Sequence, residues 1–475
     1  MDSIIKENGV TFKELEKNIF QMICEMGRNY TKDLLEKYDC YLRDNRDKSA
    51  YRHKGLKRTT IKTVYGEVVY SRAIYEVMND DGTKRYVYLL DETLELENVG
   101  LISANLAEQL VSGITEMSYR ECAKKVSEMT GQSISAMGVW NVIQSLGEKV
   151  CKEEQELVQA HKKGKLCGEK EAPVLFEEAD GVYVKLQGND RKKSYQKKAE
   201  IKVAIAYDGW KKTGKDRYEL NDKVVVAGFS KAKGFHEYRE AAIAEKYNLD
   251  ETQIRLLNAD GAAWIKKVKD KSTYFQLDPF HKHRAIKENI ADKAAGEAVR
   301  EYLDAGKIEE MFEYLEMYRD SLTENRDIEK AETLIQYFQN NREGLLPYQE
   351  QGIELPASPE GLEYRNMGTM ENHIWSIIAR RMKHNHTCWS IRGGNHLSKI
   401  LAKKCSGRLH EVTEKLKCSL FDVDKLEEIQ NDILMSAKIP TKVGKGYKYP
   451  TMGHLAGLDT ATRRSRSSLL AIAGF

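Results

Sequence analysis

The stretch PVLFEEADGVYVKL, residues 173–186, begins the part of the chain that decides the fold. It is an apolar run of strand length, rich in β-branched and aromatic residues, and it carries Asp180 directly before Gly181. Four more runs of this type follow, at residues 201–210, 223–230, 253–261 and 272–281. Helical patterns separate the later runs, at residues 234–248 and 261–270. Three successive strands, followed by strands that alternate with helices, predict an α/β fold with a mixed sheet.

Three acidic residues have positions typical of a divalent-metal site. Asp180 and Asp260 each follow an apolar run and precede a glycine, so we expect both at strand ends. Glu371 opens the amphipathic helical stretch MENHIWSIIARRMK, residues 370–383. Two carboxylates at strand ends and one on a helix can converge in space and hold two metal ions. Paired ions activate a hydroxyl and stabilise a leaving oxygen in phosphodiester chemistry.

Each of the three acids also has an ordinary structural interpretation. Glu177 and Glu178 share the run that holds Asp180, and alternation along a strand puts Glu178 on the same face as Asp180 and Glu177 on the other. Asp260 could cap a helix. Glu371 could complement a helix dipole. Further glutamates precede it at Glu350, Glu360 and Glu363.

The N-terminal third predicts helical and small β segments. Residues 10–45 repeat apolar side chains at three- and four-residue steps, which predicts a helix. Two β-rich runs on either side of MNDDGT predict a small β-meander over about 58–92. The stretch SYRECAKKVSEMTGQSISAMGVWN has the outline of a helix-turn-helix, in which Ser118 caps the first helix and Gly131 makes the turn. An ordinary helical hairpin fits the same pattern.

The remainder of the chain reads as helix, loop and basic tail. We expect a helical insertion between the last strand and the helix that carries Glu371, and a C-terminal tail rich in Lys, Arg and Gly. The expected segments are a helical segment at 1–57, a β-meander at 58–97, a helix-turn-helix-like segment at 98–171, a catalytic domain at 172–410 with an insertion at about 282–360, and a C-terminal helix and tail at 411–475.

Composition limits the classes of protein. The chain has 475 residues and a formal net charge of +3, which excludes a histone-like polycation but not a nucleic-acid binder. None of the eight cysteines forms a CxxC pair, so we expect reduced thiols. The N-terminus lacks a secretion pattern and no apolar run approaches a membrane span. We therefore expect a soluble protein of the bacterial cytoplasm, without a membrane partner.

Five motifs in order carry a family resemblance. They are YGEVVYSRAIYE with YVYLLDETLEL, the helix-turn-helix outline, ADGVYVKL, NADGAAWIK, and LDPFHKHR followed by MENHIWSIIARRMK. Together they resemble bacterial DDE insertion-sequence transposases of the ISLre type, related to Mutator-like transposases. The resemblance covers about residues 50–410. It implies a ribonuclease H-like catalytic domain, which also has the strand and helix order expected above.

The resemblance assigns roles residue by residue. Asp180, Asp260 and Glu371 would be catalytic metal ligands, and His281, three residues after Asp278, an auxiliary catalytic residue. The cofactor would be two Mg²⁺ ions, which prefer oxygen ligands, with Mn²⁺ as a substitute. The partners would be the double-stranded DNA of element ends and targets, bound by a homo-oligomer associated with the nucleoid.

Basic side chains near the predicted site could bind DNA phosphates. Arg380, Arg381 and Lys383 follow Glu371 on the same helical stretch, where we expect them to form one exposed face. The run RKKSYQKK places a second basic group in the turn after the first strand, at Arg191, Lys192 and Lys193. Both groups could instead be merely solvated.

The sequence therefore predicts a DNA transposase that cleaves and joins strands at the ends of an insertion sequence. Two alternatives remain. A ribonuclease H-like nuclease could cut without joining, and a non-catalytic DNA-binding protein could derive from a transposase.

Overall fold

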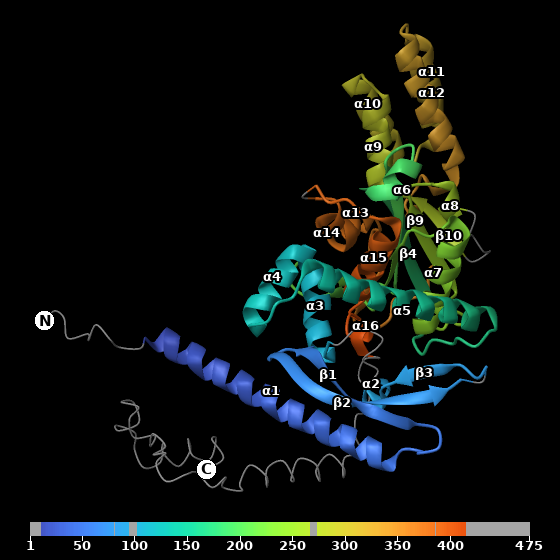
Figure 1. Ribbon diagram of the computed structural model, residues 1–475. Helices are drawn as coiled ribbons and strands as arrows, with labels where there is room; N and C mark the ends of the chain where they lie inside the picture. The colour runs from blue at the N-terminus through green and yellow to red at the C-terminus, as the bar shows by residue number, and fades with distance from the viewer. Residues whose placement is uncertain (1–10, 80, 95–101, 267–272, 385, 415–475) are drawn as a thin grey trace, which may run out of the picture.

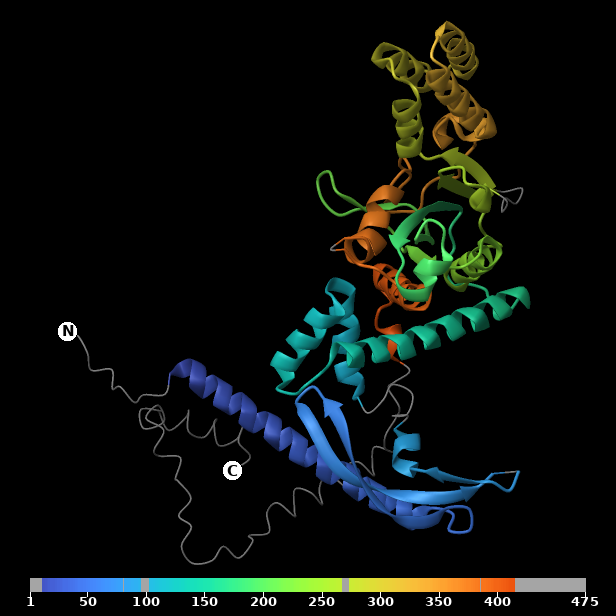
Figure 2. The same ribbon diagram turned by 45° about the horizontal axis from the view of Figure 1, so that its top comes forward.

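The computed structural model describes residues 11–79, 81–94, 102–266, 273–384 and 386–414. Figure 1 shows a long N-terminal helix beside a small sheet, a central sheet with helices on both sides, and a group of helices at the end opposite the small sheet. Figure 2 shows the same arrangement after a turn about the horizontal axis. The protein is thus a mixed α/β fold, as the sequence predicted.

The N-terminal segment is one long helix against a three-stranded sheet. Helix α1 (Phe12–Asn45) begins with a capping box between Thr11 and Glu14. Strands β1 (Arg52–Thr63), β2 (Gly66–Met78) and β3 (Lys84–Val87) form an antiparallel meander in that order. The short helix α2 (Leu89–Thr93) follows. Apolar side chains from the second half of α1 pack on β2, so the predicted helix and β-meander are both present.

Three helices connect this sheet to the centre of the molecule. They are α3 (Ala104–Glu116), α4 (Tyr119–Thr130) and α5 (Ala136–Lys162). Ser118 caps α4, as predicted, and forms a capping box with Glu121, and Gly131 ends α4 with a φ of 65°. Helix α5 is much longer than a recognition helix and packs against the later helices α7 (Ala232–Lys246) and α15 (Ile391–Cys405). One face of its first three turns is buried in the core that it shares with the central sheet.

The central sheet has five strands. They are β4 (Val174–Lys185), β5 (Lys198–Tyr207), β8 (Val224–Gly228), β9 (Ile254–Ala259) and β10 (Thr273–Leu277), in the spatial order β10-β9-β4-β5-β8. The pairs β4–β5 and β5–β8 are antiparallel, whereas β4–β9 and β9–β10 are parallel. The parallel connections run through α7 (Ala232–Lys246) and α8 (Ala263–Lys266).

Both faces of this sheet are covered, because its side chains alternate between two cores. Phe176, Val203 and Val225 belong to a core shared with α3, α4, α5 and α15. Leu175, Ala204 and Val226 belong to a core shared with α7 and the helices that follow β10. Burial on both faces explains why these strands read as continuous apolar runs in the sequence.

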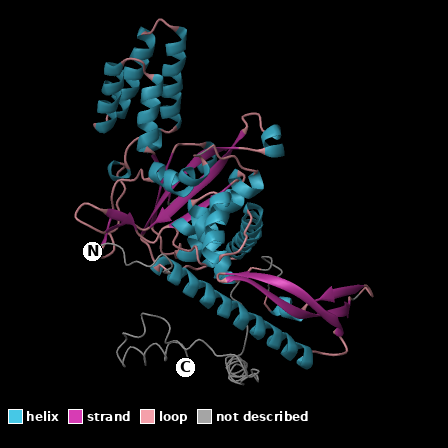
Figure 3. Ribbon diagram, turned by 60° about the vertical axis from the view of Figure 1, so that its left-hand side comes forward, coloured by secondary structure: helices cyan, strands magenta, loops and turns pink. Residues whose placement is uncertain are grey.

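A helical group follows β10, as predicted. Its helices are α9 (Pro279–Asn289), α10 (Lys293–Asp304), α11 (Ile308–Ser321) and α12 (Asn325–Asn340), with 3₁₀ turns at Arg342–Gly344 and Tyr348–Glu350. Figure 3 shows these helices in cyan beyond one end of the magenta central sheet. The insertion is therefore a separate group of helices that starts at the carboxyl end of β10.

The chain then returns to the central sheet. The returning helical segment consists of α13 (Met370–Ile374), the π-helical turn η4 (Trp375–Ala379) and α14 (Arg380–Met382), and α15 (Ile391–Cys405) and α16 (Glu411–Glu414) follow. A small sheet of β6 (Trp210–Lys212), β7 (Tyr218–Leu220) and β11 (Leu362–Glu363) was not predicted. Helix α6 (Gly188–Lys193) lies in the β4–β5 connection. Within the described residues, no helix is both long and apolar enough to cross a bilayer.

Candidate metal centre

Three neighbouring strands bring acidic residues to one edge of the central sheet. Ala179 pairs with Ala259 across β4–β9, and Ala259 pairs with Leu277 across β9–β10. The next residue on each strand is an aspartate, at Asp180, Asp260 and Asp278. Because the three strands are parallel and in register, the three aspartates lie side by side at the same level of the sheet.

The position of Asp180 corrects one expectation. It lies inside β4 rather than at the end of the strand, since β4 continues to Lys185 in antiparallel pairing with β5. It is at a strand end only relative to β9, whose pairing with β4 stops at Ala179. The longer β4–β5 hairpin therefore extends past the acids.

Asp180, Asp260 and His281 converge. A ligand atom of each lies within 4.8 Å of the others. Helix α9 supplies His281 because Asp278 caps that helix and accepts from the backbone N–H of His281 at 3.2 Å. Asp278 Oδ1 also lies 3.2 Å from His281 Nδ1, so Nε2 is left for a ligand.

Burial and neighbouring charges shift the pKa values of the residues in this cluster, partly in opposite directions. Burial raises the pKa of Asp180 to about 6, against lowering by His281 and with further raising by the charges of Asp260 and Glu371. Burial likewise raises the pKa of Asp260. Burial alone would lower the pKa of His281, but the hydrogen bond to Asp278 and the charge of Asp180 outweigh it, and the pKa is raised. The site thus holds negative charge that its own residues do not fully compensate.

Glu371 stands beside this cluster on the first turn of α13. It is exposed and does not belong to the group within 4.8 Å, although its charge acts on Asp180. The structure therefore places the third predicted acid near the site, with its side chain turned to solvent.

Glu178 fixes the start of α13, and sequence reasoning considered it only as a rival of Asp180. Its Oε2 accepts from the backbone N–H groups of Gly368, Thr369 and Met370 at 2.9–3.2 Å. Its Oε1 accepts from the hydroxyls of Thr369 and Tyr207, both at 2.7 Å. The side chain is fully buried. This carboxylate satisfies the free N–H groups of the helix start and ties Glu371 to β4.

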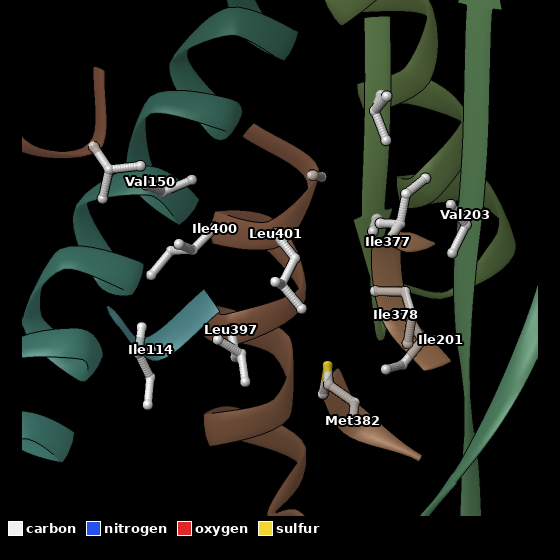
Figure 4. Close-up of a cluster of buried hydrophobic side chains, with 14 of the residues drawn as sticks. Ile114, Val150, Ile201, Val203, Ile377, Ile378, Met382, Leu397, Ile400 and Leu401 are labelled. Carbon is white, nitrogen blue, oxygen red and sulfur yellow. The ribbon is translucent and has the colours of Figure 1, made fainter. Parts of the chain in front are cut away.

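The rest of the returning segment is held by apolar packing. Ile377, Ile378 and Met382 face Ile201 and Val203 of β5 in Figure 4. The π-helical turn η4 lies between the site and α14. Such turns often occur at functional sites.

A row of polar residues lies on the same three strands, two positions before the aspartates. Glu178, Asn258 and Gln276 are paired across the three strands. Asn258 Nδ2 donates to Glu178 at 3.1 Å and to Asp278 at 2.8 Å, and Gln276 donates to Asn258 at 3.1 Å. The only sequence signal for this row is its spacing, two residues before each aspartate and so on the same strand face.

A cleft of about 320 Å³ adjoins the cluster. It extends from Asp260 and His281 to residues of α9 and α12, including Arg284 and Tyr337. The Tyr337 hydroxyl donates to the backbone oxygen of Asp260 at 2.9 Å. Gly261 is required here, because its φ is +83° and a Cβ would lie 2.2 Å from Asn341 Oδ1. The helical insertion therefore forms one wall of the site.

The two predicted basic groups differ in the structure. Arg191, Lys192 and Lys193 are exposed on α6, and Lys383 is exposed after α14. Arg380 is exposed but pairs with Glu116 at 2.5 Å. These five side chains remain accessible to a ligand.

The expectation of one exposed basic face is wrong for Arg381. This residue is 8% exposed and donates from Nε to the backbone oxygen of Ile114 at 2.7 Å. Its guanidinium lies 5.4 Å from the ring centroid of Trp389 and 6.0 Å from that of Tyr119. Burial lowers its pKa. Arg381 thus joins α14 to α3 and α4 instead of facing solvent.

Fold and site together describe a mixed α/β protein with a carboxylate–histidine cluster at one edge of its main sheet. The chain belongs to an uncharacterised protein family, UPF0236, whose profile matches residues 5–417. It is similar to several UPF0236 proteins of Caldanaerobacter subterraneus subsp. tengcongensis. One of them is 25% identical over 417 residues, covering 85% of this chain and 80% of the relative. A UPF0236 protein of Streptococcus gallolyticus is 23% identical over 342 residues, covering 70% and 72%.

Proposed function

We propose that this protein is a DNA transposase that cleaves and joins strands at the ends of an insertion sequence. The observation that carries the proposal is the convergence of Asp180, Asp260 and His281, beside the helix that presents Glu371. Two aspartates on adjacent parallel strands and an acid on a later helix form the constellation expected for phosphodiester chemistry.

The order of the sheet supports this proposal. Three strands in antiparallel succession are followed by two that add in parallel beside the first. This is the arrangement we expect of a ribonuclease H-like domain. The helical group between β10 and α13 has the place that the resemblance to ISLre-type transposases implies.

The residues present fit divalent cations. Asp180 is buried and Asp260 half-buried, and both offer the carboxylate oxygens that Mg²⁺ prefers. Burial, with the charges of Asp260 and Glu371, raises the pKa of Asp180, and a bound cation would stabilise its charged form. Asp180, Asp260 and Glu371 would hold the ions, and His281 would complete the site. When bound, such ions supply an activated hydroxyl and stabilise the leaving oxygen. The network of Glu178 and Asn258 would keep the ligands in place.

The exposed basic side chains suggest where DNA would bind. Arg191, Lys192 and Lys193 extend from the β4–β5 hairpin, past the acids, and could neutralise phosphates there. Arg381 is excluded from this role by its burial. The first three turns of α5, residues 136–148, contain no Lys or Arg and bury one face in the core, so α5 offers little for a groove contact.

The names of the relatives agree with a mobile element. One name from Caldanaerobacter joins eleven designations. If each designation stands for a separate copy of the gene, repeated transposition would produce such a set. For this chain, such a history is part of the proposal.

Cleavage of element ends tests the proposal. A supercoiled plasmid carrying the DNA that flanks the coding region is incubated with the protein and Mg²⁺. We expect cuts at both ends with the wild type and none with Asp260→Asn. Asp250→Asn, a control at an exposed aspartate outside the cluster, should cut normally. Equal cutting by all three proteins, or by none, would overturn the assignment.

A further inference from the structure

The first half of α1 carries an apolar stripe that nothing in the described structure covers. Six side chains form it, each between 37% and 79% exposed: Phe12, Leu15, Ile19, Met22, Ile23 and Met26. Figures 1 and 2 show this part of the helix extending beyond the small sheet. So many large apolar side chains on one exposed face mark an interaction surface.

This stripe is separate from the face that α1 uses to pack on its own sheet. At about 100° per residue, the six side chains occupy roughly 100° of the helix circumference. The side chains that pack on the sheet follow later in the helix, at Leu34, Leu35, Tyr38 and Leu42. Their mean direction is rotated by about 130° from the stripe. The exposed stripe therefore does not continue the face of α1 that packs on the sheet.

The opposite flank of the same segment already has a neighbour. A cleft between α1 and the end of α4 is lined by Lys17, Gln21 and Cys24 on one side and by Met129 on the other. The helix also begins with a complete capping box at Thr11 and Glu14. The segment is thus a well-formed helix that borders a cleft on one flank and carries an open apolar stripe on the other.

The spacing of the stripe indicates which kind of partner packs against it. Phe12, Leu15, Ile19, Met22 and Met26 follow one another at steps of three, four, three and four residues. This is the a and d pattern of a coiled coil, in which a seam packs against a seam of the same kind. The open stripe amounts to about 700 Å² per chain, at roughly 200 Å² for each fully exposed large side chain. Two copies would bury about 1,400 Å², within the range of specific interfaces.

We propose that α1 pairs with α1 of a second copy of this chain through this seam, defined as residues 12–26. The inference does not depend on the proposed function, since it rests on the exposed helix alone. If the protein also acts on two element ends, the seam would hold two catalytic sheets in one assembly. The dimer would exist without DNA or metal.

The mass of the full-length protein in solution tests the proposal. Light scattering after size-exclusion chromatography, at tens of micromolar protein without DNA, should give the mass of two chains. Ile19→Glu places like charges in the seam and should weaken the dimer by about a hundredfold or more, giving one chain. Gln21→Glu adds the same charge on the opposite face and should leave the dimer intact. Circular dichroism checks that both variants fold.

Three outcomes would overturn the proposal. The first is a monomeric wild type. The second is a dimer that Ile19→Glu does not weaken more than Gln21→Glu does. The third is a monomer that dimerises only after removal of residues 415–475, which would assign the seam to that tail. None of these results depends on cleavage activity, so a failure here is distinct from a failure of the proposed function.

Discussion

Replacing Asp180 by Asn should stabilise the metal-free protein. The raised pKa of Asp180, about 6 against an ordinary 3.8, means that its charged form is held at a cost in the folded state. A shift of this size corresponds to about 3 kcal/mol at pH 7. The amide removes that cost and keeps the shape. For a chain of this length we expect the unfolding midpoint to rise by about 3 °C.

The pH dependence of this gain has a definite sign. A carboxyl with a raised folded pKa costs nothing below its unfolded pKa, where both states are protonated, and its cost grows as pH rises to about 6. The difference between Asp180→Asn and the wild type should therefore be small near pH 4 and full above pH 6. Thermal unfolding in EDTA across this range measures it.

A control of opposite sign is available at Glu240. Burial would raise the pKa of Glu240, but the hydrogen bonds and charge of Arg255 outweigh it and lower the pKa to about 2. Glu240→Gln should therefore destabilise the protein at pH 7.

With Mg²⁺ added, the wild type should gain stability and Asp180→Asn should gain little. An Asp180→Asn protein that unfolds at or below the wild-type temperature in EDTA at pH 7.5 would refute this expectation.

Three further results are expected. Glu178→Ala should destabilise the protein by about 3 kcal/mol or more, because it leaves buried N–H and hydroxyl donors unpaired. Chemical denaturation measures the free energy of unfolding, and a loss under 1 kcal/mol would contradict this expectation. Arg381→Ala should cost about 2 kcal/mol of stability yet leave the salt dependence of DNA binding unchanged. Replacing Arg191, Lys192 and Lys193 by Ala should reduce the log-affinity versus log-salt slope by about 2–3 units in a binding titration, and an unchanged slope would show a solvated surface.

Much of the fold and site followed from local patterns. The strand runs, the capping box at Ser118 and the helix at the N-terminus are written in neighbouring residues, so the sequence predicted them. Asp180 lies on β4 and Asp260 directly follows β9, and the pattern predicted both strands. Parallel strands in register bring the two aspartates together, whereas His281 reaches them from α9, which Asp278 caps.

The remainder depends on contacts between distant segments. Glu178 caps a helix about 190 residues later, and Arg381 is buried because α14 meets α3, which no local pattern encodes. The small sheet joins β6 to β11 through a pairing of two residues, too short to leave a periodic signal. The seam of α1 reads in sequence like any core-facing stripe, and only the fold shows that it is left open.

Strand transfer tests the central claim most directly. Labelled duplexes that end at the element termini, already cut to expose the 3′ hydroxyl, are incubated with a target plasmid, Mg²⁺ and the protein. The wild type should join the labelled strand to the plasmid, Asp260→Asn should give no joined product, and Asp250→Asn should match the wild type. Cleavage of plasmid-borne ends without any joining of the pre-cut ends would contradict a transposase and indicate a nuclease.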